Sequence, residues 1–237
     1  MQLMKIELDV PNYTSICRRA ATLDLPELAN IGSEENINIV VDSTGLKIFG
    51  AGIWSEEKHS LKKRRQWRKL HLTVDRDSHA IIAQELTDSD ITDDSQIATM
   101  LVDVEQNISH FAADTAYDTN NVYDAIVAQS DNEVTIAIPP RMQAALFSVN
   151  YNEEPTKRDH NILFAEKYGK YRWQDYSDYN YRALAEMAMY RYKTIISDKL
   201  YSRKLAAQKI EARIACIVLN KMTVLGMPRS VKIKVAA

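Results

Sequence analysis

Two short apolar runs, each followed directly by an aspartate, constrain the fold of this chain more than any other feature. Residues 37–41 are mostly β-branched and precede Asp42, and residues 108–113 precede Asp114. Such runs are typical of buried strands. Because sites in α/β proteins form where neighbouring strands end, the two acids are candidates for one site. An aspartate at a strand end is also a common turn former or helix cap, so the pair alone does not define a function.

The other patterns place these two strands in an α/β fold. The first strand is expected to end at Asp42, with a Ser-Thr-Gly bend before an extension at 46–49, and a hairpin is expected over 70–86. Helices are predicted at 13–23, 97–104, 119–129, 179–196 and 203–219, and a further strand at 134–138 that ends at Pro139-Pro140. This order predicts a mixed sheet flanked by helices over residues 36–237. Residues 141–178 are polar with weak periodicity, and we interpret them as an irregular insertion.

Composition excludes several classes of protein. Of the 237 residues, 46% are hydrophobic and 26% charged, which is ordinary for a globular protein. No apolar run reaches the roughly 20 residues that span a bilayer. Charged residues interrupt the segment Met1–Val10, so it does not resemble a secretory signal, and a cytoplasmic location is expected. Cys17 and Cys216 lack the spacing of a zinc site and are interpreted as buried thiols.

A basic block precedes the predicted hairpin, although the net charge of the chain is −2. Its members that we consider candidates for binding DNA phosphates are Lys62, Lys63, Arg64, Arg65 and Arg68. A solvated loop is the alternative interpretation. Trp54, Trp67 and Trp173 lie near basic residues and suit either stacking on bases or core packing.

The predicted helix at 179–196 carries a polar stripe. Tyr179, Arg182, Glu186 and Lys193 fall within roughly 60° of one another on an ideal helix with 3.6 residues per turn. Polar stripes usually face solvent, but this helix also carries many apolar residues and must pack closely. An acid between two basic side chains on a packed helix suits a site that holds both a metal ion and a phosphate.

Three carboxylates from separate elements suit metal-dependent phosphoryl chemistry. Mg²⁺ prefers carboxylate and water oxygens. Two such ions, about 4 Å apart, can activate an attacking hydroxyl and stabilise the leaving oxygen at phosphorus. Asp42, Asp114 and Glu186 are therefore the predicted metal ligands, while Arg182 and Lys193 are expected to contact the phosphate backbone.

The spacing Tyr179-x2-Arg182-x3-Glu186-x6-Lys193 resembles the Y-R-E-K signature of DDE transposases from bacterial insertion sequences. The segments that resemble the branch called insertion-sequence family five are 41–47, 68–72, 113–119 and 219–223. The likeness extends from about Pro11 to the basic tail.

This resemblance implies a ribonuclease H-like fold with Asp42, Asp114 and Glu186 as the catalytic acids. It implies two Mg²⁺ or Mn²⁺ ions, and double-stranded DNA, both transposon ends and target, as the partner. Tyr179, Arg182 and Lys193 match positions that support the third acid and contact the transposon end. The implied reaction is nicking at the element's ends and transfer of the freed 3′-hydroxyl to target DNA, by a homo-oligomer assembled on DNA.

Two departures from the family pattern leave alternatives open. Thr115 replaces the glycine that usually follows the second aspartate, and it would strain a backbone of positive φ. Relatives also carry a DNA-binding region before the first strand, whereas residues 1–35 are interpreted as a remnant of it in a shortened copy. The alternatives are a non-catalytic remnant, which binds DNA or full-length transposase and inhibits it, and a host nuclease of the same fold.

Overall fold

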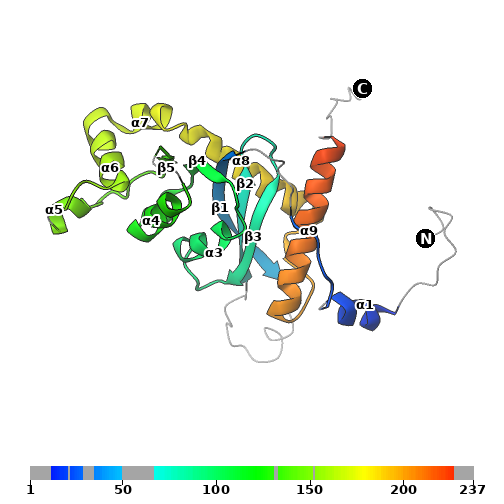
Figure 1. Cartoon of the computed structure of the whole chain (residues 1–237). Coiled ribbons are helices and arrows are strands. Elements are labelled where there is room, and N and C mark those ends of the chain that lie inside the picture. Colours follow the sequence, from blue (N-terminus) through cyan, green and yellow to red (C-terminus); the bar gives the residue numbers. More distant parts are fainter. Residues whose placement is uncertain are drawn as a thin grey trace, which may run out of the picture.

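The computed structural model describes residues 12–20, 22–28, 35–49, 67–130, 133–151 and 153–226. A mixed sheet lies at its centre, in the order β3-β2-β1-β4-β5, with β6 also paired to β1 (Figure 1). The strands are β1 (Asn36–Ile48), β2 (Trp67–Asp75), β3 (Ile81–Asp88), β4 (Asn107–Ala112), β5 (Thr135–Ala137) and β6 (Lys199–Leu200). The β1–β2 and β2–β3 pairs are antiparallel, and β4, β5 and β6 join in parallel. The predicted α/β class with a mixed sheet is confirmed.

Helices cover both faces of this sheet (Figure 1). The α-helices are α1 (Tyr13–Ala20), α3 (Ile97–Leu101), α4 (Asn120–Ala128), α5 (Phe147–Tyr151), α6 (Lys157–Tyr168), α7 (Lys170–Tyr176), α8 (Ala183–Arg191) and α9 (Leu205–Leu225). Short 3₁₀ turns are η2 (Asp94–Gln96), η3 (Thr115–Tyr117) and η4 (Tyr179–Arg182), and η5 (Tyr192–Ile196) is a π-helical turn. Within the described residues, every helix is too short or too polar to cross a bilayer.

Side-chain alternation along β1 divides the interior into two apolar layers. Ile37, Ile39 and Val41 face α3 and α4, whereas Leu46 belongs to the layer under α8 and α9. Leu28, from the segment that precedes β1, lies in the second layer. A polar substitution at Ile39 or Leu46 would therefore enter a closed core.

The first strand does not end at Asp42, as the sequence had predicted, but runs without a bend to Ile48. The reason is its partner, because β2 pairs with β1 continuously from Ile39 to Lys47. The parallel pairing with β4 stops much earlier, at Val40. Asp42 therefore lies just beyond the point where β4 leaves β1.

The interpretation of residues 141–178 as irregular was wrong, because α5, α6 and α7 lie within them. Only a few side chains of these helices are buried, so the sequence carries little apolar periodicity. The start of α6 is set instead by a capping box, in which Thr156 and Asp159 each accept a hydrogen bond from the other's backbone N–H.

The predicted helix over 179–196 is helical throughout but not uniform. It begins as the 3₁₀ turn η4, continues as α8 and ends as the π-helical turn η5. Residues three apart eclipse one another in a 3₁₀ turn, so Tyr179 lies in line with Arg182. Asp178, immediately before η4, has a left-handed backbone with φ of 57°. The ideal α-helical geometry from which the polar stripe was inferred therefore does not hold at its two ends, near Tyr179 and near Lys193.

Candidate active site

The three predicted acids come from three elements that meet on one face of the sheet. Asp42 lies on β1, Asp114 lies two residues after β4 as the N-cap of η3, and Glu186 lies in the first turn of α8. Asp42 is buried, Asp114 is partly buried and Glu186 is exposed. The acids therefore line a site that runs from the sheet to solvent.

A small apolar floor explains why these acids share a face. Val40, Ala112 and Ala185 pack together as a buried cluster. Because side chains two residues apart on an extended strand point to the same side, Asp42 follows Val40 onto this face and Asp114 follows Ala112. Because the side chains of Ala112 and Ala185 are small, α8 can approach the sheet closely.

Arg182 bridges two of the acids. Its Nη2 lies 3.3 Å from Asp42 Oδ2, and its Nη1 lies 2.7 Å from Glu186 Oε1. The Arg182 side chain is 26% exposed, and its Nε is buried with no hydrogen-bond partner among the described residues. The guanidinium thus lies between Asp42 on the sheet and Glu186 on the helix.

The pKa of the Asp42 carboxyl is raised, and the causes show that the acids act on one another. Burial is the largest cause, and the negative charges of Asp114 and Glu186 raise the pKa further. The backbone N–H of Ser43, which donates to Asp42 Oδ1 at 2.7 Å, and the Arg182 guanidinium oppose this rise. All three acids therefore contribute to one electrostatic site.

The turn at Asp114 accommodates Thr115 without strain. Asp114 caps η3 by accepting a hydrogen bond from the Ala116 backbone N–H at 2.8 Å. Thr115 is the first residue of this 3₁₀ turn, and the non-glycine residues of positive φ in the described part of the chain are His79 and Asp178. The departure from glycine at this position has no backbone cost here.

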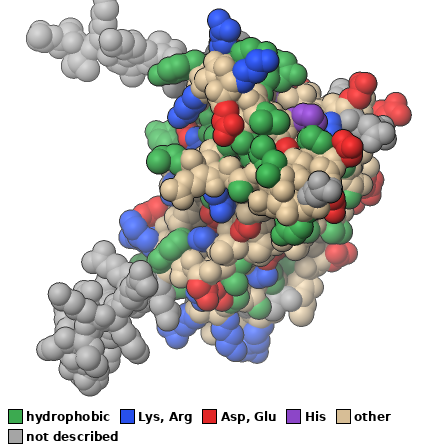
Figure 2. Space-filling model, turned by 90° about the vertical axis from the view of Figure 1, so that its left-hand side faces the viewer, with side chains coloured by type: hydrophobic (Ala, Val, Ile, Leu, Met, Phe, Trp, Pro, Cys, Tyr) green, Lys and Arg blue, Asp and Glu red, His purple; other side chains and the backbone are tan. Residues whose placement is uncertain are grey.

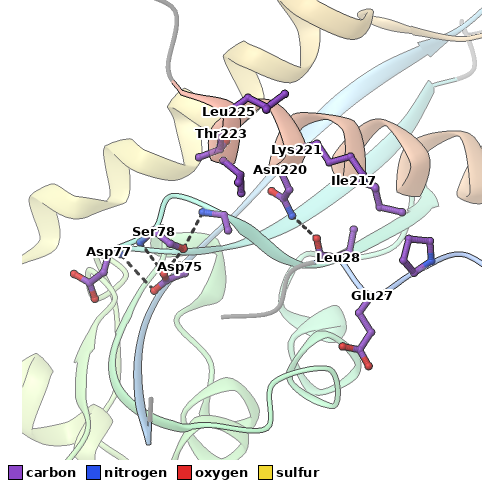
Figure 3. Close-up of a pocket in the computed structure, with 13 residues that line it drawn as sticks. Glu27, Leu28, Asp75, Asp77, Ser78, Ile217, Asn220, Lys221, Thr223 and Leu225 are labelled. Carbon is purple, nitrogen blue, oxygen red and sulfur yellow. Dashed lines mark hydrogen bonds between the residues drawn. The ribbon is translucent and has the colours of Figure 1, made fainter. Parts of the chain in front are cut away.

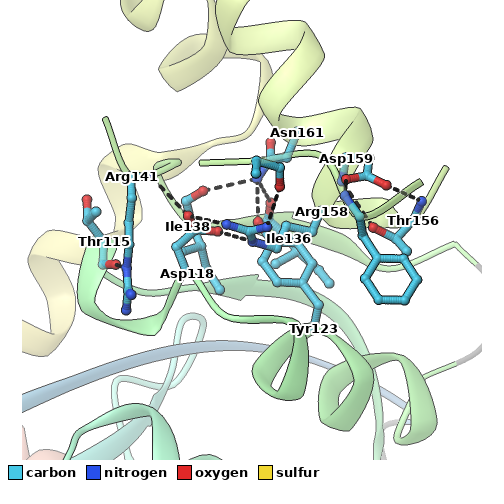
Figure 4. A network of polar contacts seen from close by, with 12 residues as sticks. Thr115, Asp118, Tyr123, Ile136, Ile138, Arg141, Thr156, Arg158, Asp159 and Asn161 are labelled. Carbon is cyan, nitrogen blue, oxygen red and sulfur yellow. Dashed lines mark hydrogen bonds and ion pairs between the residues drawn. The ribbon is translucent and has the colours of Figure 1, made fainter. Parts of the chain in front are cut away.

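A polar network holds the segment after Asp114 in place (Figure 4). Asp118 forms a bidentate ion pair with Arg158 of α6, with Arg158 Nε 2.7 Å from Oδ1 and Nη2 3.0 Å from Oδ2. Arg141 donates its backbone N–H to Asp118 Oδ2 and its guanidinium to the Ala116 carbonyl, both at 2.9 Å. The helical segment 141–178 therefore positions the turn that carries Asp114. Sequence reasoning missed this role, because no local pattern pairs two residues 40 positions apart.

Tyr179 lies beside the triad, while Lys193 lies further along the helix. Tyr179 packs against the Val40 cluster, and its ring centroid is 5.4 Å from that of Trp173. Lys193 is partly buried in η5. Trp173 is buried and donates its indole N–H to Asn161, so it belongs to the core.

Most of the predicted basic surface lies outside the described residues, namely Lys62, Lys63, Arg64 and Arg65, together with Trp54. Arg68 is described and lies on β2, where it pairs with Asp88 and donates to Gln208 Oε1 at 2.9 Å. Trp67 is partly exposed and lies close over Gly45. Figure 2 shows the end of the molecule formed by the insertion, where basic and acidic side chains are mixed.

A groove of about 990 Å³ lies between the β2–β3 turn, residues 26–28 and the end of α9 (Figure 3). The residues described along it do not include the triad. Asn220 connects the elements on both sides of this groove through hydrogen bonds. Its Nδ2 donates to the carbonyls of Leu28 and Ile81 at 2.7 Å each, and its Oδ1 accepts from the Ile81 N–H at 2.8 Å. This contact joins the segment before β1 to α9.

The donor chemistry of the triad fits a hard divalent cation, but its present arrangement does not surround one. Carboxylate oxygens are the ligands that Mg²⁺ prefers. Across the described residues, no group of three or more His, Cys, Asp or Glu side chains is placed to hold an ion. Arg182 occupies the position between Asp42 and Glu186.

Two protein families match this chain. Residues 35–221 match a family described as a transposase DDE domain, and residues 1–51 match a second family of the same description. The chain therefore belongs to the DDE transposase domain family.

A solved structure, a piggyBac transposase synaptic complex with hairpin DNA, is similar to this chain with 6% identity and a TM-score of 0.49. The similarity covers 81% of this chain and 47% of that one. The chain thus spans about half the length of the solved protein.

Proposed function

We propose that this chain is the catalytic core of a bacterial insertion-sequence transposase, with a ribonuclease H-like fold and Asp42, Asp114 and Glu186 as its catalytic acids. The observation that carries the proposal is the convergence of these three acids on one face, in a chain that belongs to the DDE transposase domain family. The sheet order β3-β2-β1-β4-β5, with an antiparallel first half, supports the fold. The Y-R-E-K spacing supports the insertion-sequence assignment.

The acids would hold Mg²⁺ or Mn²⁺, two ions in the full site, and such ions activate the attacking oxygen and stabilise the leaving one. Asp42 provides a buried carboxylate fixed by the Ser43 N–H, and Asp114 one fixed by the Ala116 N–H. Glu186 provides an exposed carboxylate that can adjust to the substrate.

The substrate in this proposal is double-stranded DNA, first at the transposon ends and then at the target. Hydrolysis of a phosphodiester bond frees a 3′-hydroxyl, which then attacks a target phosphorus and displaces another 3′-oxygen. Tyr179, Arg182 and Lys193 contact the DNA backbone. The proposal includes a homo-oligomer on paired ends and a cytoplasmic, nucleoid-associated location.

Cleavage of a duplex that carries the inverted repeats flanking the gene tests this function. The purified chain should nick this duplex at the repeat and join it to a plasmid with Mg²⁺ or Mn²⁺ present. Glu186→Gln, Asp42→Asn and Asp114→Asn should each abolish both steps. Glu105→Gln, which changes an exposed acid outside the site, is the matched control and should leave both unchanged. Cleavage that survives Glu186→Gln would remove Glu186 from the triad.

A further inference from the structure

Arg182 is the counter-ion of the acids in this structure. It contacts Asp42 and Glu186 at the same time, at 3.3 and 2.7 Å, from a position that is only 26% exposed. Three carboxylates that influence one another repel, and a single guanidinium with two Nη groups satisfies a pair of them. Arg182 thus provides a neutralisation that a divalent cation could also supply.

The same contacts leave Arg182 incompletely satisfied. Its Nε is buried and has no partner among the described residues, and a buried donor without a partner is unfavourable. A move of the guanidinium to an anion that accepts more of its hydrogen bonds is therefore favourable. A DNA phosphate is such an anion, because it accepts two parallel hydrogen bonds from one guanidinium.

We propose that Arg182 is an exchangeable lock on the triad. By this we mean that its guanidinium must leave Asp42 and Glu186 before these carboxylates can share a cation. DNA binding draws the guanidinium to a phosphate, so phosphate binding and cation binding favour each other. The protein without DNA then holds metal weakly, and this weak binding limits hydrolysis at sites other than the bound DNA. This inference rests on the proposed function, since it takes the three acids as the metal site.

Direct measurement of Mn²⁺ binding tests the lock without any catalytic assay. Calorimetry and the paramagnetic resonance signal of free Mn²⁺ would give the affinity for the wild-type chain and for Arg182→Gln. We expect Arg182→Gln to bind Mn²⁺ about fivefold or more tightly than wild type, a change typical of coupled sites. Arg182→Lys should fall between them, since an ammonium cannot present two parallel donors. This second variant keeps a positive charge beside Asp42 if the glutamine variant folds poorly.

Two controls separate the lock from its alternatives. Lys167→Gln removes an exposed positive charge on α6, away from the Arg182 contacts, and it should leave Mn²⁺ affinity unchanged. Addition of the inverted-repeat duplex should tighten Mn²⁺ binding in Arg182→Gln far less than in wild type, because the guanidinium that DNA withdraws from the acids is already absent. Equal affinities in wild type and Arg182→Gln, or an equal gain in Lys167→Gln, would overturn the lock and leave the triad intact. If wild type and Arg182→Gln both fail to bind Mn²⁺, the metal triad itself is wrong.

Discussion

Arg158 and Asp118 form a buried bidentate ion pair that joins α6 to the turn after β4, with Nε–Oδ1 and Nη2–Oδ2 distances of 2.7 and 3.0 Å. The Asp118 side chain is fully buried and that of Arg158 is 11% exposed. Because Asp118 lies four residues after Asp114, this pair connects the helical insertion to a predicted catalytic acid. Its removal should affect both stability and cleavage.

Replacement of Arg158 by methionine should lower the free energy of unfolding by about 3–5 kcal/mol, since it leaves the buried Asp118 carboxylate without its ion-pair partner. Urea denaturation measures this change. Asp118→Asn in the same background should restore part of the loss, because it removes the unpaired charge. Arg172→Met, on the exposed side of α7, is the control and should change stability little. An equally large effect from that control would contradict a specific role for the Arg158–Asp118 pair.

The backbone at Asp178 should tolerate asparagine better than alanine. Asp178 has φ of 57° and ψ of 28° directly before η4, a left-handed conformation that asparagine adopts more readily than other non-glycine residues. Both substitutions remove the negative charge of the weak 3.5 Å pair with Arg76, so most of their difference reports the backbone conformation. We expect Asp178→Ala to be about 1 kcal/mol less stable than Asp178→Asn in thermal unfolding. Equal stabilities would show that the turn relaxes.

His71 should make the protein less stable in mild acid. Burial lowers the pKa of His71 to about 4, against 6.5 for an exposed histidine, and its Nε2 lies 2.9 Å from Thr87 Oγ1. Between about pH 4 and pH 6.5, His71 takes up a proton in the unfolded chain but not in the folded chain. The free energy of unfolding therefore falls as the pH falls through this range. The loss from His71 is about 2 kcal/mol between pH 7 and pH 5.

Urea denaturation at both pH values tests this dependence. His71→Gln should reduce it, whereas His160→Gln, on the exposed face of α6, should keep the wild-type slope. A wild-type slope in His71→Gln would assign the dependence to another group, such as buried His110, whose pKa burial also lowers.

The basic block should carry DNA affinity that depends on salt but not on sequence. Simultaneous replacement of Lys62, Lys63, Arg64 and Arg65 by alanine should weaken binding to any duplex. It should also reduce the slope of log affinity against log salt by about 0.9 for every phosphate that the variant no longer neutralises. Fluorescence anisotropy at several salt concentrations measures this slope. Arg68→Ala should have a smaller effect, because Arg68 is already engaged by Asp88 and Gln208. An unchanged slope in the fourfold variant would favour a solvated loop.

The central part of the fold was predictable because its signals are local. Patterns of only a few residues predict the strands. These patterns are the apolar runs before Asp42 and Asp114 and the alternation in the hairpin between them. The class of fold followed from their order. The continuation of β1 to Ile48 was not predictable, because it depends on β2 pairing across a bend-like Ser-Thr-Gly sequence.

The order of residues was enough to predict the three candidate acids and the mixed α/β class, since alternation along strands and spacing along a helix are local patterns. The folded chain was needed to show that Arg182 contacts Asp42, 140 positions away, and that Arg158 binds Asp118. It was also needed to show that residues 141–178 contain helices, because polar contacts rather than an apolar stripe hold α6 in place. Ion pairs between residues far apart in the sequence produce no periodic pattern of residue types. Their partners are therefore determined only when the sheet and helices pack together.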